Sequence, residues 1–205
     1  KSTLLSILTG REGYESGSIV YRNDLRVSCL EQSPKFNPEE SVLDACFNHK
    51  GDPDKVLKAK QILTTLKITD LNQPMVQLSG GQQKRVALAN VLILEPDLLI
   101  LDEPTPALDV EASSRVGAIL VDRLKSDGTT TVLVTHDVAE AVELGTRMIV
   151  LERGRVVEDG SPAEVLARPV SAFGASLAGL NAVAGVLRAD GDGLPSIDVG
   201  GGQEL

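Results

Sequence analysis

The sequence has 205 residues, of which 42% are apolar and 24% charged, and its formal net charge is −9. This length suits one full domain with a small extension, and the composition excludes an intrinsically disordered chain. The negative charge argues against direct DNA binding and against non-specific attachment to anionic lipid. No apolar run is long enough to cross a membrane, and two cysteines outside any metal-like spacing predict free thiols, so we expect a cytoplasmic location.

The charge is unevenly divided along the chain. Residues 1–97 contain 12 Lys+Arg and 12 Asp+Glu, whereas residues 98–205 contain 8 and 17, so the second part carries the whole net charge. Eight of the nine lysines lie in the first part. The simplest explanation is a solvated, lysine-rich helical arm followed by an acidic half.

In the first part of the chain, apolar spacing predicts a helix over Lys1–Gly10. Two short strands, Val20–Tyr21 and Val27–Leu30, are expected on either side of a polar turn. Helical spacing returns in Ser41–Phe47 and Asp54–Leu66. After these helices, a glycine-containing loop at residues 78–82 is predicted to lead into a further helix.

The elements that follow alternate between apolar strands and helices, which predicts an α/β fold with a mainly parallel sheet. Two apolar runs are expected to be strands buried on both faces. A hairpin and a capping box with proline at the first helical position come later. The predicted elements are Gln83–Leu94 (helix), Leu98–Leu101 (strand), Val110–Lys125 (helix), Thr130–Val134 (strand), Val138–Leu144 (helix), Met148–Glu152 with Arg155–Glu158 (hairpin) and Ser161–Glu164 (capping box).

Three short motifs could take part in binding or hydrolysing a phosphate group, although each alone is weak evidence for such a site. Lys1-Ser2-Thr3 matches the end of the phosphate-loop pattern G-x-x-x-x-G-K-[ST], but it also suits an ordinary helix start. Asp102-Glu103 closes an apolar strand, where one carboxylate could serve a magnesium ion and the other an attacking water. His136 also follows a strand, a position where histidine is more often structural.

The most specific motif is Leu78-Ser79-Gly80-Gly81-Gln82. Its glycines allow close backbone approach to an oxyanion, and the following helix directs its positive end at the same point. Together with the three motifs above, with Gln32 and with Ala107-Leu108-Asp109, it gives residues 1–160 a resemblance to the ATP-binding cassette (ABC) ATPases. The order of the motifs is that of the family, so the joint match is highly specific.

The resemblance implies a P-loop NTPase fold of ABC type, with a mainly parallel sheet, a helical subdomain at about residues 40–95 and a short C-terminal extension. It implies a nucleotide-binding domain over residues 1–173 and a linker with a truncated extension over residues 174–205. It further implies that ATP and Mg²⁺ are bound. We expect the glycines and the strand of the phosphate loop to precede Lys1 and to be missing from the chain.

The resemblance also implies a role for each matching residue. Glu103 is the expected general base, and His136 and Gln32 are the other expected catalytic residues. The nucleotide contacts are expected from Lys1, Ser2, Thr3, Ser79, Gly80, Gly81, Gln82 and Asp109. The metal ligands are expected to be Ser2, Gln32 and Asp102. In this family the signature caps ATP held by another cassette, so a second cassette is an expected partner.

The two parts of the sequence resemble different branches of the family. Residues 1–97 resemble ABC-F proteins, which are twin-cassette factors that act on ribosomes. Residues 98–205 resemble the ATP-binding subunits of importers, especially those for molybdate and related oxyanions. Because lysine usage changes at the same place, we hypothesise a mosaic of two sources joined near residues 94–105.

Three functions follow from these resemblances. The first is an importer ATPase that works with a membrane permease, peripheral to the inner membrane. The second is an ABC-F factor with the ribosome as its partner, although such a factor would want two cassettes and a more basic surface. The third is an inactive fragment that lacks the phosphate-loop glycines.

Overall fold

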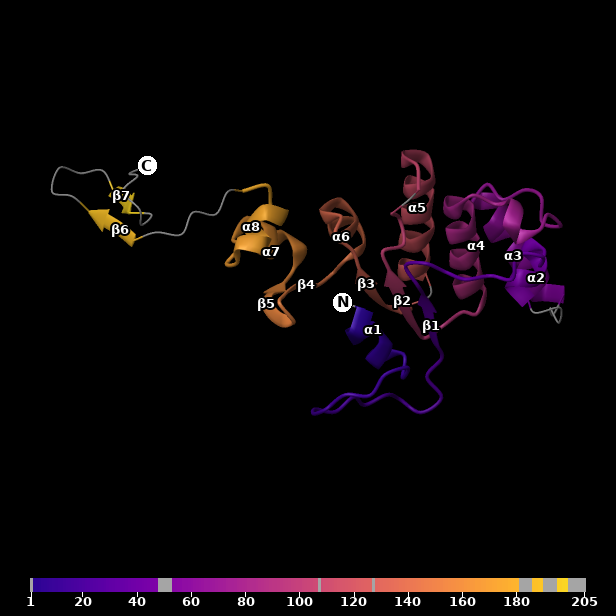
Figure 1. Cartoon of the computed structure of the whole chain (residues 1–205), viewed down its shortest axis with the longest axis horizontal. Helices are drawn as coiled ribbons and strands as arrows, with labels where there is room; N and C mark the ends of the chain where they lie inside the picture. The colour runs from indigo at the N-terminus through magenta and orange to yellow at the C-terminus, as the bar shows by residue number, and fades with distance from the viewer. Residues whose placement is uncertain are drawn as a thin grey trace. The chain divides into compact units, whose positions relative to one another are not determined.

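The computed structural model describes residues 2–47, 53–106, 108–126, 128–180, 186–189 and 195–198. The chain divides into two compact units, residues 1–145 and residues 146–205. Figure 1 labels the helices and strands of each. The division predicted between residues 173 and 174 therefore does not coincide with this one, and it stays a prediction. Within the described residues, no helix combines the length and the apolar character needed to span a bilayer.

Three parallel strands form the sheet of the first unit, in the order β1-β2-β3. They are β1 (Val27–Leu30), β2 (Leu98–Asp102) and β3 (Thr130–Val134). The central strand β2 is buried at Leu99, Ile100 and Leu101, which confirms a strand covered on both faces. The prediction that β3 is equally buried is wrong: its residues are intermediate or exposed, because among the described strands it has a neighbour on one side only.

Helices make up most of the rest of the first unit. The bounds are α1 (Ser2–Leu8), α2 (Val42–Phe47), α3 (Pro53–Thr65), the 3-10 helix η1 (Met75–Gln77), α4 (Gly80–Ile93), α5 (Val110–Ser126) and α6 (Val138–Leu144). The strand predicted at Val20–Tyr21 is wrong. Val20 is 89% exposed, and the segment pairs with no described strand, so two residues alone cannot form a ladder. The expected turn before β1 is present, with Asp24 at φ 62°.

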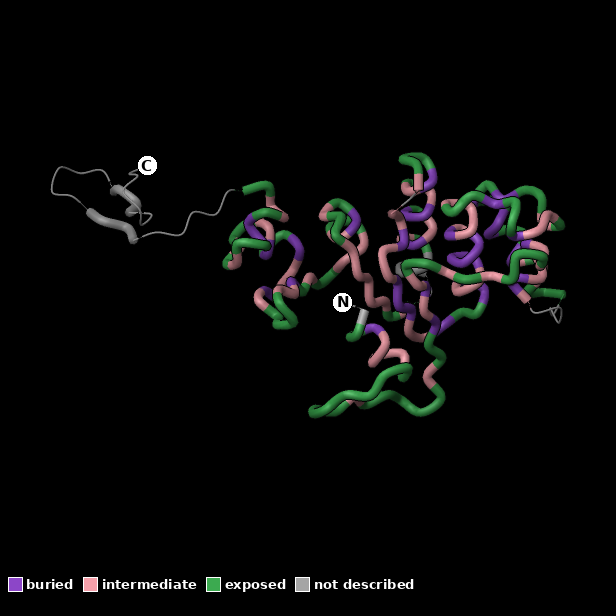
Figure 2. Tube along the Cα trace, in the orientation of Figure 1, coloured by how far each residue is buried: buried purple, intermediate pink, exposed green. Residues whose placement is uncertain are grey.

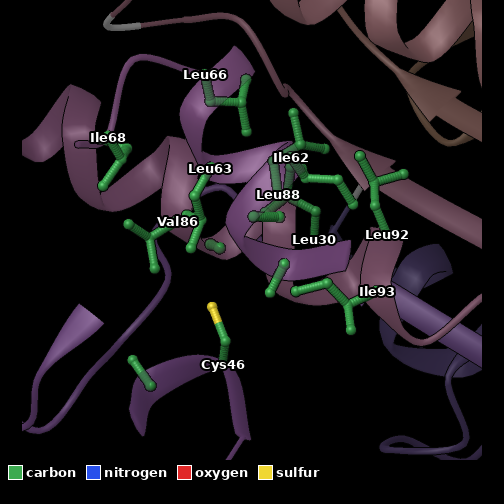
Figure 3. Packing of buried hydrophobic residues seen from close by; sticks show 14 of the residues in the cluster. Leu30, Cys46, Ile62, Leu63, Leu66, Ile68, Val86, Leu88, Leu92 and Ile93 are labelled. Carbon is green, nitrogen blue, oxygen red and sulfur yellow. The ribbon is translucent and has the colours of Figure 1, made fainter. Parts of the chain in front are cut away.

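The core of the first unit lies where α2, α3 and α4 pack together and α4 meets β1 (Figure 2). Leu63 and Leu88 are at most 1% exposed, and they lie close to Leu30 of β1 in Figure 3. Cys46 faces the same cluster, and burial raises the pKa of its thiol to about 12. Both cysteines are free, as predicted. Helix α4 therefore supports both the helical layer and the first strand of the sheet.

The second unit begins with the predicted hairpin, formed by β4 (Met148–Glu152) and β5 (Arg155–Gly160). The capping box is confirmed as well. The Ser161 side chain accepts a hydrogen bond from the Glu164 amide at the start of α7 (Pro162–Ala167), and the Glu164 side chain accepts one from the Ser161 amide. The segment predicted as a linker contains regular structure, namely most of α8 (Ala172–Leu177) and an antiparallel pair, β6 (Val186–Ala189) with β7 (Pro195–Asp198).

Candidate functional site

Three polar side chains meet at the carboxyl edge of the first unit's sheet. Gln32 follows β1, Glu103 follows β2 and His136 follows β3. The Gln32 amide nitrogen Nε2 donates to Glu103 Oε2 at 3.4 Å, and His136 Nδ1 lies 3.2 Å from Glu103 Oε1. Parallel strands place their ends at one edge, which is why residues so far apart in sequence come together. We refer to Gln32, Glu103 and His136 as the sheet-edge cluster.

Glu103 is the centre of this cluster. Its side chain is 15% exposed, whereas that of His136 is 63% exposed, so the carboxylate is sheltered while the imidazole faces outward. The Glu103 amide donates to the Val134 carbonyl at 2.8 Å, which anchors the residue to β3. Its φ of 48° lies in the left-handed region, which is uncommon for a non-glycine residue and is shared by four other described residues, including Asp24.

Asp102 is the last residue of β2 and pairs with Val134 in the sheet. Its side chain is half-buried, and its carboxylate is close enough to Lys84 to favour the charged form of that lysine. Asp102 and Gln32 both supply oxygen atoms at this edge. Oxygen donors suit Mg²⁺, which typically takes only one or two protein carboxylates together with substrate phosphates. The residues present therefore fit a magnesium site.

The signature Leu78–Gln82 differs from its prediction in one respect. Helix α4 begins at Gly80 rather than at Gln83, because Ser79 is the N-cap and forms a capping box with Gln82. Ser79 Oγ accepts from the Gln82 amide at 3.3 Å, and Gln82 Oε1 accepts from the Ser79 amide at 2.8 Å. Both glycines are thus in the first turn of a helix, where backbone N–H groups lack intrahelical partners.

Gly80 is exposed, and a Cβ atom added to it would meet nothing of this chain within 4 Å. Its lack of a side chain is therefore not explained by packing within the chain. Glycine at this position allows close approach to the backbone at the start of α4.

Asp109 has a local structural role. Its Oδ1 accepts a hydrogen bond from the Ala112 amide at 2.8 Å at the start of α5, and this bond is the main reason that the pKa of Asp109 is lowered. The structure shows Thr3 as an exposed residue of α1. Lys1, Ala107 and the side chain of Ser2 lie outside the described residues, so their predicted contacts stay predictions.

Sequence reasoning assigned no role to Lys84 or to Glu140, which are both buried beside the cluster. Lys84 Nζ donates to three backbone carbonyls, and burial raises the pKa of the Glu140 carboxyl. A signal for Lys84 was available, because it precedes the buried Leu88 and Leu92 at four-residue intervals on α4. A lysine on the apolar stripe of a helix needs hydrogen-bond partners in the interior.

The profile of the ABC transporter family matches residues 1–106. The molybdenum import ATP-binding protein of Mycobacterium tuberculosis is 37% identical over 86% of this chain and 51% of its own length. The sulfate/thiosulfate import ATP-binding protein of Xylella fastidiosa is 35% identical over 93% of this chain and 61% of its own. This chain therefore spans about half the length of the first of these relatives.

Solved structures agree with the sequence relatives. A dimeric ATP-binding cassette in a post-hydrolysis state, bound to ADP and Pi, superposes with a TM-score of 0.68 and 27% identity, over 78% of this chain and 80% of its own. The importer alignments cover too much of the chain to be confined to either side of residue 97. The ABC-F resemblance of residues 1–97 and the mosaic origin stay predictions, because these comparisons do not show them.

Proposed function

The chain belongs to the ABC transporter family, and we propose that it binds and hydrolyses ATP as the ATP-binding subunit of a membrane importer. The observation that carries this proposal is the contact of both Glu103 carboxylate oxygens with side chains from neighbouring strand ends. A carboxylate fixed in this way at a sheet edge is well placed to accept a proton from a water molecule that attacks a phosphate.

Glu103 is the proposed general base. Each carboxylate oxygen offers about two lone-pair positions, so contacts with Gln32 and His136 leave room for a water to donate to the same group. Gln32 holds one oxygen, and His136, being largely exposed, is positioned to contact the terminal phosphate from the solvent side.

Asp102, Gln32 and the Ser2 hydroxyl are the proposed holders of Mg²⁺. When bound, the ion supplies positive charge that neutralises the phosphate oxygens. Lys1 and Thr3 are proposed to bind phosphates beside Ser2, in line with the family pattern.

The signature is proposed to act on a nucleotide held by a second cassette, and a related cassette has been solved as a dimer. Ser79 and Gln82 bond to each other, while the space in front of Gly80 is open within this chain. The start of α4, with Ser79, Gly80, Gly81 and Gln82, therefore suits contact with phosphate from a partner, and we place Asp109 at the same dimer interface. Two copies would hold two nucleotides between them.

The transported solute is proposed to be an oxyanion such as molybdate or sulfate, because the relatives with the names above import molybdenum and sulfate or thiosulfate. In this role the chain works with a permease and lies at the cytoplasmic face of the membrane. Co-purification with a permease, and stimulation of ATP hydrolysis by it, would support this assignment.

The test of the ATPase function is Glu103→Gln in the chain extended at its amino terminus by a phosphate loop. We expect kcat to fall on the order of 10²–10⁴-fold, the usual contribution of a general base, while ATP binding is retained. Glu39→Gln, at an exposed glutamate outside the cluster, is the matched control and should leave kcat unchanged. Equal hydrolysis with and without the Glu103 carboxylate would show that it is not the base.

A further inference from the structure

Lys84 lies on α4 two residues after the signature, and it is only 5% exposed. Its Nζ donates to the carbonyls of Glu31 at 2.9 Å, Gln32 at 2.7 Å and Asp102 at 3.3 Å. An ammonium group has three N–H donors and no acceptor, so all three donors have a partner. Lys84 thus joins three segments: the start of α4, the backbone after β1 and the end of β2.

The net effect of the surroundings is to lower the pKa of Lys84, and burial is the largest cause. The carboxylates of Asp102, Glu103 and Glu140 act in the opposite direction. A buried ammonium ion is tolerated when hydrogen bonds and opposite charges compensate for lost hydration. The three carbonyls and three carboxylates supply both.

We propose that Lys84 is a positioning residue that holds the backbone of Gln32 against the end of β2 and links this arrangement to the signature helix. The proposal rests on the proposed ATPase function and deepens it. Lys84 fixes the position of the Gln32 backbone through its carbonyl. The Gln32 side chain therefore extends from a fixed backbone position to Glu103.

The same contact gives the two cassettes a means of communication. The signature ends in the first turn of α4, and Lys84 follows in the same helix. A shift of α4 caused by a nucleotide on the partner would move Nζ relative to the Gln32 carbonyl. The position of Gln32 at one nucleotide would thereby depend on how the signature engages the other.

The chemistry of lysine suits this position better than that of its substitutes. Lys84→Met keeps the length and packing of the side chain but removes all three donors. Lys84→Arg keeps the charge, but its planar fork cannot direct donors at three carbonyls in the way that a tetrahedral ammonium does. Lys60→Met removes the same charge from an exposed position of α3 and is the matched control.

The first test is hydrogen exchange, which needs no ATP. Mass spectrometry should show faster exchange of a peptide covering residues 28–36 in Lys84→Met than in the unmodified chain or in Lys60→Met, with a peptide from α5 unchanged in all three. Unaltered exchange at residues 28–36 in Lys84→Met would overturn the proposal, whether or not the protein hydrolyses ATP. Faster exchange throughout the first unit would also overturn it, because the effect would then be general unfolding.

The second test is a double-mutant cycle with Gln32→Ala, made in the chain carrying an amino-terminal phosphate loop. Lys84→Met should lower kcat about 10–100-fold, as loss of supporting contacts does at other sites, with binding of trinitrophenyl-ATP unchanged. In the Gln32→Ala background the same change should cost less than about twofold, because the residue acts through Gln32. Additive effects would overturn the proposal, whereas a parent protein without ATPase activity would count against the proposed function instead.

Discussion

The sheet-edge cluster and the signature are both polar, but they are satisfied in different ways. Glu103 is contacted by side chains from two other strand ends, so the cluster is assembled from three parts of one chain. Ser79 and Gln82 bond only to each other among the hydrogen bonds of the described side chains, and Gly80 faces open space. This difference supports the proposal that the chain builds one side of a phosphate site within itself and presents the other side to a second cassette.

Both regions depend on the packing of α4, and one substitution in the core can weaken that packing. Leu88→Ala opens a cavity where α4 packs on α3 and on Leu30 of β1, at a residue only 1% exposed. We expect the free energy of unfolding to fall by about 2–5 kcal/mol. Chemical denaturation measures the change. Leu57→Ala, at a leucine of α3 that is 59% exposed, is the control, and a comparable loss there would contradict the packing described.

A substitution at Gly80 should separate the two regions. Gly80→Asp places a negative charge in the first turn of α4, where the helix dipole favours it, so the stability of the chain should rise by about 0.3–1 kcal/mol. The same charge would repel a phosphate on a partner cassette, so kcat should fall on the order of 10²–10³-fold, as when an anion-binding donor is lost. Thermal unfolding and ATPase assays measure the two effects. A fully active variant would show that phosphate does not approach Gly80.

The smallest effect is expected at the other end of β2. Asp97 precedes the strand and pairs with Arg26 there, and the hydrogen bond from the Arg26 side chain is the main cause that lowers the pKa of Asp97 from 3.8 to about 2. Because the folded value is the lower one, this contact stabilises the protein above about pH 4, and the contribution disappears as the pH falls through about 2.

Asp97→Asn should therefore reduce the loss of stability in acid and should leave ATP hydrolysis unchanged. The effect is small because solvent screens an exposed ion pair. Denaturation at pH 7 and at pH 3 measures it, with Glu39→Gln as a control at an exposed carboxylate. A large fall in kcat would mean that the acid at the beginning of β2 belongs to the site as much as Asp102 at its end.

Much of the fold could be predicted from the sequence, because the spacing of apolar residues and the residues that begin or end helices and strands indicate the same element boundaries along the chain. The helix Val138–Leu144, the strand Thr130–Val134 and the hairpin around Arg153 and Gly154 form as expected. The strand at Val20–Tyr21 failed because a strand needs a partner, and local composition does not report pairing. The start of α4 was placed late because the glycines of the signature resemble a loop until the bonds between Ser79 and Gln82 are considered.

In the site, too, residues within sequence motifs could be predicted, whereas contacts between segments far apart in the sequence could not. The resemblance to ABC ATPases implied that Gln32, Glu103 and His136 act together, and the structure brings their side chains together. The apolar stripe of α4 indicates only that Lys84 needs interior partners, and those partners could not be identified because they are backbone carbonyls from segments 18 to 53 residues away. The left-handed backbone at Glu103 was missed because a glutamate in the sequence does not indicate a positive φ.

The most direct test of the central claim is a mixing experiment with two inactive variants of the phosphate-loop-extended chain. Glu103→Gln disables the base, and Gly80→Asp disables the signature, so each alone should be inactive. If every site combines the base of one copy with the signature of the other, random mixing makes half of the dimers mixed, each with one intact site, and restores about a quarter of the parental ATPase activity. Dimers that form on mixing without any recovery of activity would contradict a site shared between copies.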